Sequence, residues 1–366
     1  MHFLHRALNE NTALASAVAA LSDVIDSNAL KLGLLLDLNP LWLAAYRAQE
    51  AGLNVVVPME AIEWSHMWMQ PGGMYLGDDV PDLSRTFDFV DWLTERYFGR
   101  STKQFQPYLL RIVARPLRDP DELTRHREER QALLTAAREA QIPTLVETRA
   151  PPRLLAAAGD RILSNGVLGT LGGFLHDNIT GDEFAVTCGH VVSQGIVSDA
   201  HGNAIGKCNK IAAPHPLPTG VRCHAACGSV NELDLALVPV PQRGANTVNA
   251  ISQNIYNGDI VEMNGAVSGR RRYQVGAAVI DHEIGGSCWS RLFQIRAIIP
   301  ATILPVAVYM AITPPPQNGD SGSWLTRNTS EWSGMVIAAD QFHGYALAAT
   351  TVVSQGNKKF GTDLSL

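Results

Sequence analysis

The chain lacks several features that would place it in a familiar class. No segment reaches the roughly 18 consecutive apolar residues that a membrane-spanning helix requires, so no membrane partner is expected. It contains 29 Lys and Arg against 35 Asp and Glu, for a net charge of -6. A nucleic-acid partner is therefore not expected either, because such proteins usually carry a basic stripe. The tightest basic run, 270–272, lies in a strand-like pattern and is expected to be a solvated hairpin.

Cysteine is also scarce, which bears on the redox compartment. The chain has five cysteines, an odd number with no regular spacing, so we expect reduced thiols and a cytoplasmic location. The first twenty residues carry only one arginine, and Asn9, Glu10 and Asn11 interrupt their apolar run. We expect this segment to begin a helix and not to be a signal peptide.

At 366 residues the chain is long enough for two domains, and its two parts differ in pattern. In the first 150 residues, helical periods alternate with short apolar runs, which predicts an α/β regulatory or substrate-recruiting domain. Leu14, Val18, Leu21 and Ile25 share one helical face after a candidate cap at Asn11. Further helices are expected over 41–51, 84–97 and 119–140, and strands over 32–38, 55–57, 109–113 and 144–146.

Nothing in this first part identifies a ligand. Asp78, Asp79 and Asp82 lie close together, but a solvated acidic loop is expected there and not a cation site. The proline-containing stretch 151–161 is expected to be a linker. It separates the first domain, 1–150, from a second domain over 162–366.

After the linker, short apolar runs are broken by Gly, Pro, Asn and Asp. The pattern predicts an antiparallel sandwich or barrel, because no helical period separates the runs. The runs are GVLGTLGGFL, EFAVTC, LDLALVPV, YQVGAAVI, LFQIRAII, VAVYMAI, SGMVIAA and YALAATTVV.

Three polar residues in this all-β region suggest nucleophilic catalysis. Ser321 stands between glycines in NGDSGS, where a tight turn exposes a hydroxyl beside backbone N–H groups. Serine needs a base within hydrogen-bond reach, and that base needs an orienting group. His190 follows the strand EFAVTC and is a candidate base. Asp234 lies within the apolar run LDLAL, where a buried carboxylate requires a partner such as an imidazole.

These blocks resemble those of the trypsin-like (chymotrypsin-fold) serine proteases. FAVTCGHVV resembles the histidine block, DLAL the aspartate block and NGDSGSW the nucleophile block. The order His, Asp, Ser is also that of the family, with separations of 44 and 87 residues. GTLGGFL and MNGAVSGRRRYQVGAAV resemble segments of bacterial and plant intracellular members. The resemblance covers about residues 160–360 and implies an all-β double barrel.

The resemblance also implies a role for each residue of the site. Ser321 attacks the peptide carbonyl, His190 transfers the proton, and Asp234 orients the imidazole. The N–H groups of Gly319 and Ser321 would form the oxyanion hole. The carboxylate of Asp320 supports this loop, in the family often by pairing with a newly cleaved N-terminus.

Activation and specificity are less well marked. Arg161-Ile162 loosely resembles an activation site, but Ser164 and Asn165 replace the expected glycines, so a linker arginine is expected. Pro315 occupies the position where trypsins keep an acidic pocket floor. Asp340 is a candidate for the specificity pocket, where it would favour Lys or Arg, or is a strand-end turn residue.

The cysteines leave two alternatives for one group of residues. Cys208, Cys223, His224 and Cys227 could bind zinc, but their spacing is loose and thiols are expected instead. Cys188 is expected to be a packed thiol beside His190. No metal or cofactor is therefore expected.

The sequence thus predicts a serine endopeptidase acting on proteins or peptides, with a regulatory partner at its first domain. Two alternatives stay open. One is a catalytically silent protease-fold binding or scaffold protein. The other is a protein that cleaves itself between its domains and releases an active fragment.

Overall fold

The structure is a computed structural model. It describes residues 2–39, 107–117, 120–148, 153–154, 160–192, 195–199, 201–241, 246, 248–298, 314–328 and 330–366. The elements expected over 41–51, 55–57 and 84–97, the run VAVYMAI and the acidic group Asp78, Asp79 and Asp82 lie outside these residues. No helix in the described part of the chain is both long and apolar enough to cross a membrane.

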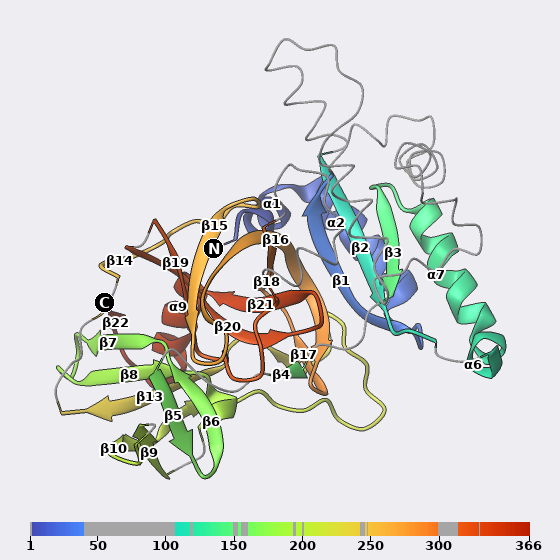
Figure 1. Ribbon diagram of the computed structural model, residues 1–366. Helices are drawn as coiled ribbons and strands as arrows, with labels where there is room; N and C mark the ends of the chain where they lie inside the picture. The colour runs from blue at the N-terminus through green and yellow to red at the C-terminus, as the bar shows by residue number, and fades with distance from the viewer. Residues whose placement is uncertain are drawn as a thin grey trace.

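A closed β-barrel occupies the C-terminal part of the fold (Figure 1). Its strands run in the order β15-β19-β20-β21-β18-β16, and β15 also pairs with β16, which closes the ring. The strands are β15 (Ile260–Gly265), β16 (Gly269–Ile284), β18 (Leu292–Ala297), β19 (Trp324–Arg327), β20 (Glu331–Ala339) and β21 (His343–Ala348). Inward-facing apolar side chains such as Tyr273, Phe293 and Leu325 fill this barrel.

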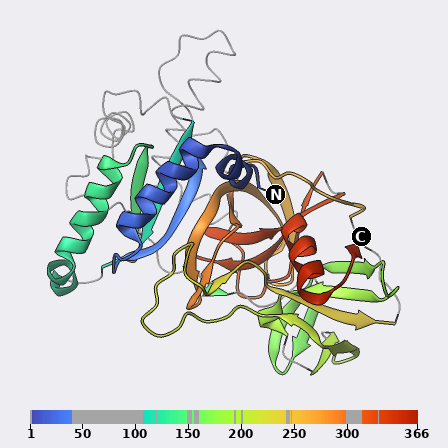
Figure 2. The same ribbon diagram turned by 180° about the vertical axis from the view of Figure 1, so that it is seen from behind.

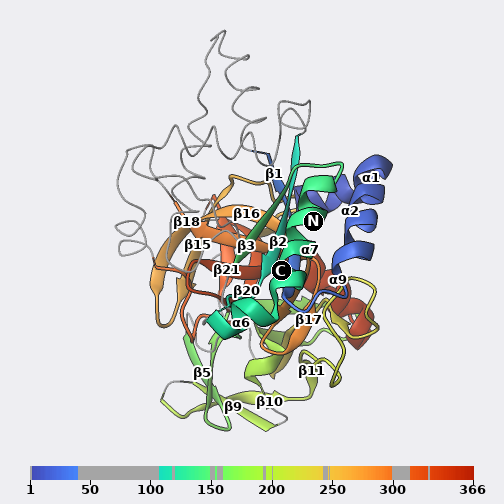
Figure 3. The same ribbon diagram turned by 90° about the vertical axis from the view of Figure 1, so that its right-hand side faces the viewer.

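A half-barrel precedes it in the chain and is built from two sheets. One has the order β10-β9-β5-β6 and the other β11-β13-β8-β7-β22. The strands are β5 (Asp160–Ser164), β6 (Val167–Leu171), β7 (Gly173–Asp177), β8 (Glu183–Thr187), β9 (Gly195–Asp199), β10 (Ala204–Cys208), β11 (Lys210–Ala212), β13 (Leu235–Val240) and β22 (Leu364–Ser365). Figure 3 shows β5, β9 and β10 at the bottom of the view, below the strands of the closed barrel. The expected all-β double-barrel architecture is therefore confirmed as a closed barrel and a half-barrel.

The N-terminal residues extend the sheet of the closed barrel. The order continues β16-β1-β2-β3, with β1 antiparallel to β16 in the register Leu34↔Asp281. The elements are α1 (Phe3–Glu10), α2 (Thr12–Ile25), β1 (Lys31–Leu38), β2 (Tyr108–Ala114), α6 (Pro120–Arg125), α7 (Arg127–Glu139) and β3 (Thr144–Thr148). We call this group the N-terminal layer.

Most elements of this layer were predicted from the sequence. The α2 helix, with the Asn11 side chain accepting a hydrogen bond from the Leu14 N–H, and the strands β1, β2 and β3 are confirmed. The helix expected over 119–140 is instead two helices, because the backbone of His126 leaves helical geometry between them.

Both faces of the N-terminal layer are covered. α2 and α7 lie on one face of the strands (Figure 2), where Leu34, Leu36 and Ile112 join their apolar side chains. Leu35 and Val113 point to the other face and join the main core with the barrel residues. The predicted division into domains 1–150 and 162–366 stays a prediction, but strand pairing joins the two parts in one 13-stranded sheet. The predicted linker contains β4 (Arg153–Leu154), which pairs with β20, and the start of β5.

One predicted strand is half wrong. The run YALAATTVV begins in β21 but continues as helix α9 (Ala349–Phe360). Its β-branched residues suggested a strand, yet Ala349, Val352 and Gly356 repeat at helical spacing and are the buried residues of α9. Packing of this face against the core therefore overrides the local preference for a strand.

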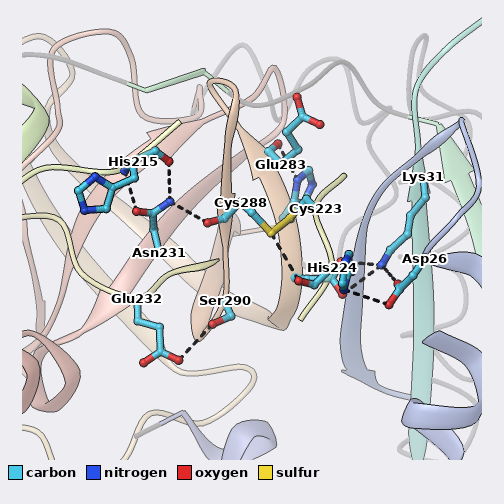
Figure 4. Close-up of a disulfide and its surroundings, with 12 residues drawn as sticks. Asp26, Lys31, His215, Cys223, His224, Asn231, Glu232, Glu283, Cys288 and Ser290 are labelled. Atoms are coloured by element: carbon cyan, nitrogen blue, oxygen red, sulfur yellow. Dashed lines mark hydrogen bonds and ion pairs between the residues drawn. A yellow bond between two sulfur atoms is a disulfide. The ribbon is translucent and has the colours of Figure 1, made fainter. Parts of the chain in front are cut away.

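A disulfide joins Cys223 and Cys288 (Figure 4), which corrects the expectation that all the cysteines are thiols. Cys288 lies on β17 (Ser287–Trp289), and Cys223 lies in the loop that leads to β12 (Val230–Asn231). Asn231 fixes that loop: its amide group donates to the carbonyl oxygens of His215 and Cys288, each at 3.0 Å. The disulfide thus ties a long loop to the barrel shortly before Asp234.

Candidate active site

His190 and Asp234 meet at one end of two paired strands. β8 ends at Thr187, and His190 follows in the short helix η3 (Gly189–Val191). Asp234 directly precedes β13, which pairs with β8 in the register Ala236↔Thr187. Both oxygens of the Asp234 carboxylate contact His190: Oδ1 accepts its backbone N–H at 2.9 Å, and Oδ2 lies 2.5 Å from Nδ1. The carboxylate is fully buried, so its charge depends on this imidazole and the nearby donors.

Cys188 completes the buried surroundings of this pair. Its thiol donates to the Val336 carbonyl oxygen at 3.3 Å. Burial and the neighbouring Asp234 charge raise the pKa of Cys188 well above the ordinary thiol value. The thiol therefore stays protonated at neutral pH and is a poor nucleophile. This agrees with the sequence interpretation of Cys188 as a packed thiol beside the site.

Ser321 lies close to these residues, across the boundary between the two barrels. A Cβ added at Gly322 would lie 2.7 Å from the Thr187 hydroxyl, so the loop that carries Ser321 touches the end of β8. Ser321 itself is fully buried, and its hydroxyl donates to the Ile337 carbonyl oxygen at 3.0 Å. Because an attacking serine must give its proton to a base, this hydroxyl has to turn from Ile337 towards His190.

Hydrogen bonds hold the loop before Ser321 in place. Asp320 N–H donates to the Gln317 carbonyl oxygen at 2.9 Å, and Gly319 has φ = 123°, which favours glycine. The carbonyl oxygens of Gly319 and Ser321 accept hydrogen bonds from the hydroxyl and the N–H of Thr170 on β6. Among the described residues, the N–H groups of Gly319 and Ser321 have no partner. They are therefore available to a developing oxyanion.

The carboxylate of Asp320 is fully occupied inside the protein. Ser268 donates its hydroxyl at 2.5 Å and its N–H at 3.2 Å, and the N–H groups of Val267 and Gln317 donate at 3.3 and 2.8 Å. The Asp320 carboxylate is thus held by groups of the folded chain itself. Ile162, next to the activation-like Arg161, is buried in β5 and pairs with both β6 and β9. The geometry thus gives no role to cleavage after Arg161.

Sequence reasoning missed Ser268, Val267 and Thr170 as parts of the site. The segment MNGAVSG resembles a second-barrel segment, but nothing in the sequence shows that the hydroxyl of Ser268 and the amides of Val267 and Ser268 face Asp320. The short loop between β15 and β16 is only a weak sign of a role in the site, because hairpin loops of this kind are common.

The contact between Gly265 and Asp320 provides a test of this support. A Cβ at Gly265 would lie 2.2 Å from Asp320 Oδ1. We expect Gly265→Ala to displace the carboxylate, to distort the Gly319–Ser321 peptides and to lower the reaction rate of Ser321 about 100-fold, the usual effect of losing one oxyanion donor. Stopped-flow labelling of Ser321 would measure this rate. Gly228→Ala is the control, since a Cβ there meets nothing within 4 Å and the backbone is outside the left-handed region. A Gly265→Ala rate equal to the control rate would show that Asp320 does not shape the loop.

The two candidate specificity residues lie near the site with different surroundings. Pro315 is half-buried in the segment before Gly319. The Asp340 carboxylate is 2% exposed and accepts hydrogen bonds from the N–H groups of Phe342 and His343, both at 2.7 Å. Such a carboxylate fits the strand-end turn residue weighed from the sequence better than a contact for a basic substrate side chain.

One group of residues in the described part of the chain could ligate a metal ion. The ligand atoms of Cys188, His190 and Asp234 all lie within 4.8 Å of one another. His190 and Asp234 are already hydrogen-bonded to each other, so the expectation of no metal or cofactor stays a prediction. The zinc alternative with Cys223 is wrong, because that sulfur is in the disulfide.

No protein-family model matches the sequence, and no curated protein does. Solved structures that resemble it are trypsin- and chymotrypsin-fold serine proteases. Thermobifida fusca protease A and a Nocardiopsis protease are each 15% identical, with TM-scores of 0.39; each match covers 58% of this chain and 98% or 100% of theirs. A glutamic acid-specific serine protease that uses a histidine triad in substrate binding is 14% identical, with a TM-score of 0.38 and coverage of 56% and 97%. At identities of 14–15% and TM-scores of 0.38 and 0.39, these matches support no inference about this chain. The site is therefore argued from the strand pairing and side-chain geometry alone.

Proposed function

We propose that the protein is a serine endopeptidase that hydrolyses peptide bonds in protein or peptide substrates. The buried Asp234 carboxylate bound to both the N–H and Nδ1 of His190 is the observation that carries this proposal. Burying a carboxylate costs desolvation free energy, and a histidine that only supports the fold does not need one beside it. A general base does, because its tautomer and ring orientation must be fixed.

Each residue then has a defined step. The Ser321 hydroxyl turns to His190 and attacks the substrate carbonyl, and the imidazole takes its proton. The N–H groups of Gly319 and Ser321 stabilise the oxyanion. His190 returns the proton to the leaving amine, and water then hydrolyses the acyl-enzyme by the same route in reverse. All of these steps use this chain's own groups.

Partners and location are part of the same proposal. The substrate is a protein or peptide, and the N-terminal layer is the candidate site of a regulatory partner. The cytoplasmic location expected from the sequence stays a prediction. The Cys223–Cys288 disulfide favours an oxidising compartment instead, because such bonds seldom persist among reduced thiols.

Labelling with a fluorophosphonate probe tests the proposal. We expect the wild-type chain to be labelled at Ser321, and Ser321→Ala and His190→Ala to lose the label. Ser354→Ala is the matched control, because Ser354 is an exposed serine on α9. Failure to label folded wild-type protein would count against catalysis.

The silent binding-protein alternative has one observation in its favour. Ser321 is fully buried and its hydroxyl is bonded to Ile337. That alternative predicts no labelling of the wild type, so the same experiment separates the two functions. Self-cleavage between the predicted domains predicts a cut near residues 150–162, which intact mass would reveal directly.

A further inference from the structure

The turn between β20 and β21 lies close to the segment that carries Ser321. β20 carries Ile337, whose carbonyl oxygen accepts the Ser321 hydroxyl, and the strand ends two residues later at Ala339. The turn Asp340–His343, here called the Asp340 turn, follows and leads into β21. A Cβ at Gly344, next to this turn, would lie 2.7 Å from Pro316 in the segment before Gly319. The Asp340 turn therefore lies beside the segment that leads to Ser321.

The Asp340 carboxylate defines the shape of this turn. Its Oδ1 accepts the N–H groups of Phe342 and His343, and its Oδ2 accepts the Tyr345 hydroxyl at 2.9 Å. Gln294 on β18 in turn donates its amide to the Tyr345 oxygen at 3.1 Å. The turn is thus fixed from inside the barrel.

The same hydrogen-bonded chain reaches the N-terminal layer. Arg111 on β2 donates to the Gln294 side-chain oxygen at 3.4 Å and to Asp37 on β1 at 3.1 Å. Its other terminal nitrogen donates to both oxygens of Glu147 on β3, each at 3.0 Å. Arg111, Gln294 and Tyr345 are all at most 3% exposed.

Stability alone is a weak reason for such an arrangement. A buried ion pair is often no more stabilising than apolar side chains of the same volume, because desolvation of the charges is costly. Its best-attested use is to fix one arrangement among several. In this protein, the hydrogen-bonded groups extend from Glu147 on β3 to the Asp340 turn.

We infer that Arg111, Gln294 and Tyr345 are positioning residues through which the N-terminal layer holds the Asp340 turn in the form that receives substrate. This inference rests on the proposed peptidase function. It gives the N-terminal layer a role at the site that does not require it to touch substrate. Loss of Arg111, Gln294 or Tyr345 from this series of hydrogen bonds loosens the Asp340 turn and weakens substrate binding. The reactivity of the Ser321 hydroxyl stays unchanged.

Two nearly isosteric variants of the full chain test the link. Tyr345→Phe removes one hydroxyl, and Gln294→Met removes the amide that connects Tyr345 to Arg111. We expect KM for fluorogenic tetrapeptide amides to rise about tenfold, kcat to change less than about twofold, and fluorophosphonate labelling to stay unchanged. The control is Ser333→Ala, a buried hydroxyl on β20 with no hydrogen-bond partner among the described residues.

A second measurement needs no catalytic activity. The Phe342 and His343 amides donate to Asp340, so both variants should raise their hydrogen exchange about tenfold or more, while the control does not. Unchanged exchange and KM in both folded variants would overturn the inference. A change with Tyr345→Phe alone would overturn the link to the N-terminal layer. Absence of wild-type labelling would refute the peptidase proposal, and the exchange data would still decide whether the turn is held this way.

Discussion

Replacing Asp234 by asparagine is expected to lower the reaction rate of Ser321 about 10⁴-fold without unfolding the protein. The carboxylate accepts the His190 N–H at 2.9 Å and lies 2.5 Å from Nδ1. An amide in its place favours the wrong imidazole tautomer and gives no negative charge to stabilise the imidazolium. The fold should persist, because asparagine has the same shape and its burial removes the cost of a buried charge.

The rate of fluorophosphonate labelling measures this effect without knowledge of the substrate. Asp182→Asn is the control, since Asp182 is exposed and its carboxylate, among the described residues, accepts a hydrogen bond from nearby Thr180. Thermal unfolding of both variants checks the fold. If Asp234→Asn labels within tenfold of wild type, Asp234 does not orient the base, and the triad assignment is wrong.

Removing the Cys223–Cys288 disulfide is expected to lower the free energy of unfolding by about 4 kcal/mol. The two cysteines are 65 residues apart, and closing a loop of that length removes considerable entropy from the unfolded chain. We also expect a loss of activity. Asn231, three residues before Asp234, donates its side-chain amide to the Cys288 carbonyl oxygen, so loosening the loop should disturb the Asp234 carboxylate.

Urea unfolding of the double variant Cys223→Ser, Cys288→Ser would measure this loss. Cys227→Ser is the matched control, because Cys227 belongs to the same buried cluster but is not in the disulfide. Reducing agent should reproduce the double variant with the wild-type protein. Equal unfolding midpoints for the double variant and the control would show that the bond adds nothing to stability.

The sequence predicted the parts of the site that lie within single strands and turns. Asp234 stood out because a lone carboxylate in an apolar run needs a partner, and the turn around Ser321 has a recognisable glycine pattern. Arg111 carries the same signal, as the one charge in YLLRIVA, and that signal could have revealed it. Its partners could not be found, because they come from three other strands.

The sequence also predicted strands more reliably than their partners. β1 was expected as a strand of a separate domain, but its pairing with β16 depends on long-range contacts that no local pattern encodes. The disulfide was missed for a related reason, since five cysteines permit several pairings and only the fold selects one. In α9, burial of one helical face decided against the β-branched residues.

The pairing of β1 with β16 has a consequence for how the chain is made. Lys31 and Asp281, which form a buried ion pair between these strands, are 250 residues apart. On the ribosome, β1 therefore emerges long before the strand that completes its sheet. During that interval the hydrophobic side chains of β1 and one of its edges stay exposed. Exposed apolar surface and unpaired strand edges are what chaperones bind on nascent chains. We expect folding to be slow and largely post-translational, with the N-terminal layer and the closed barrel becoming protected from proteolysis at the same time.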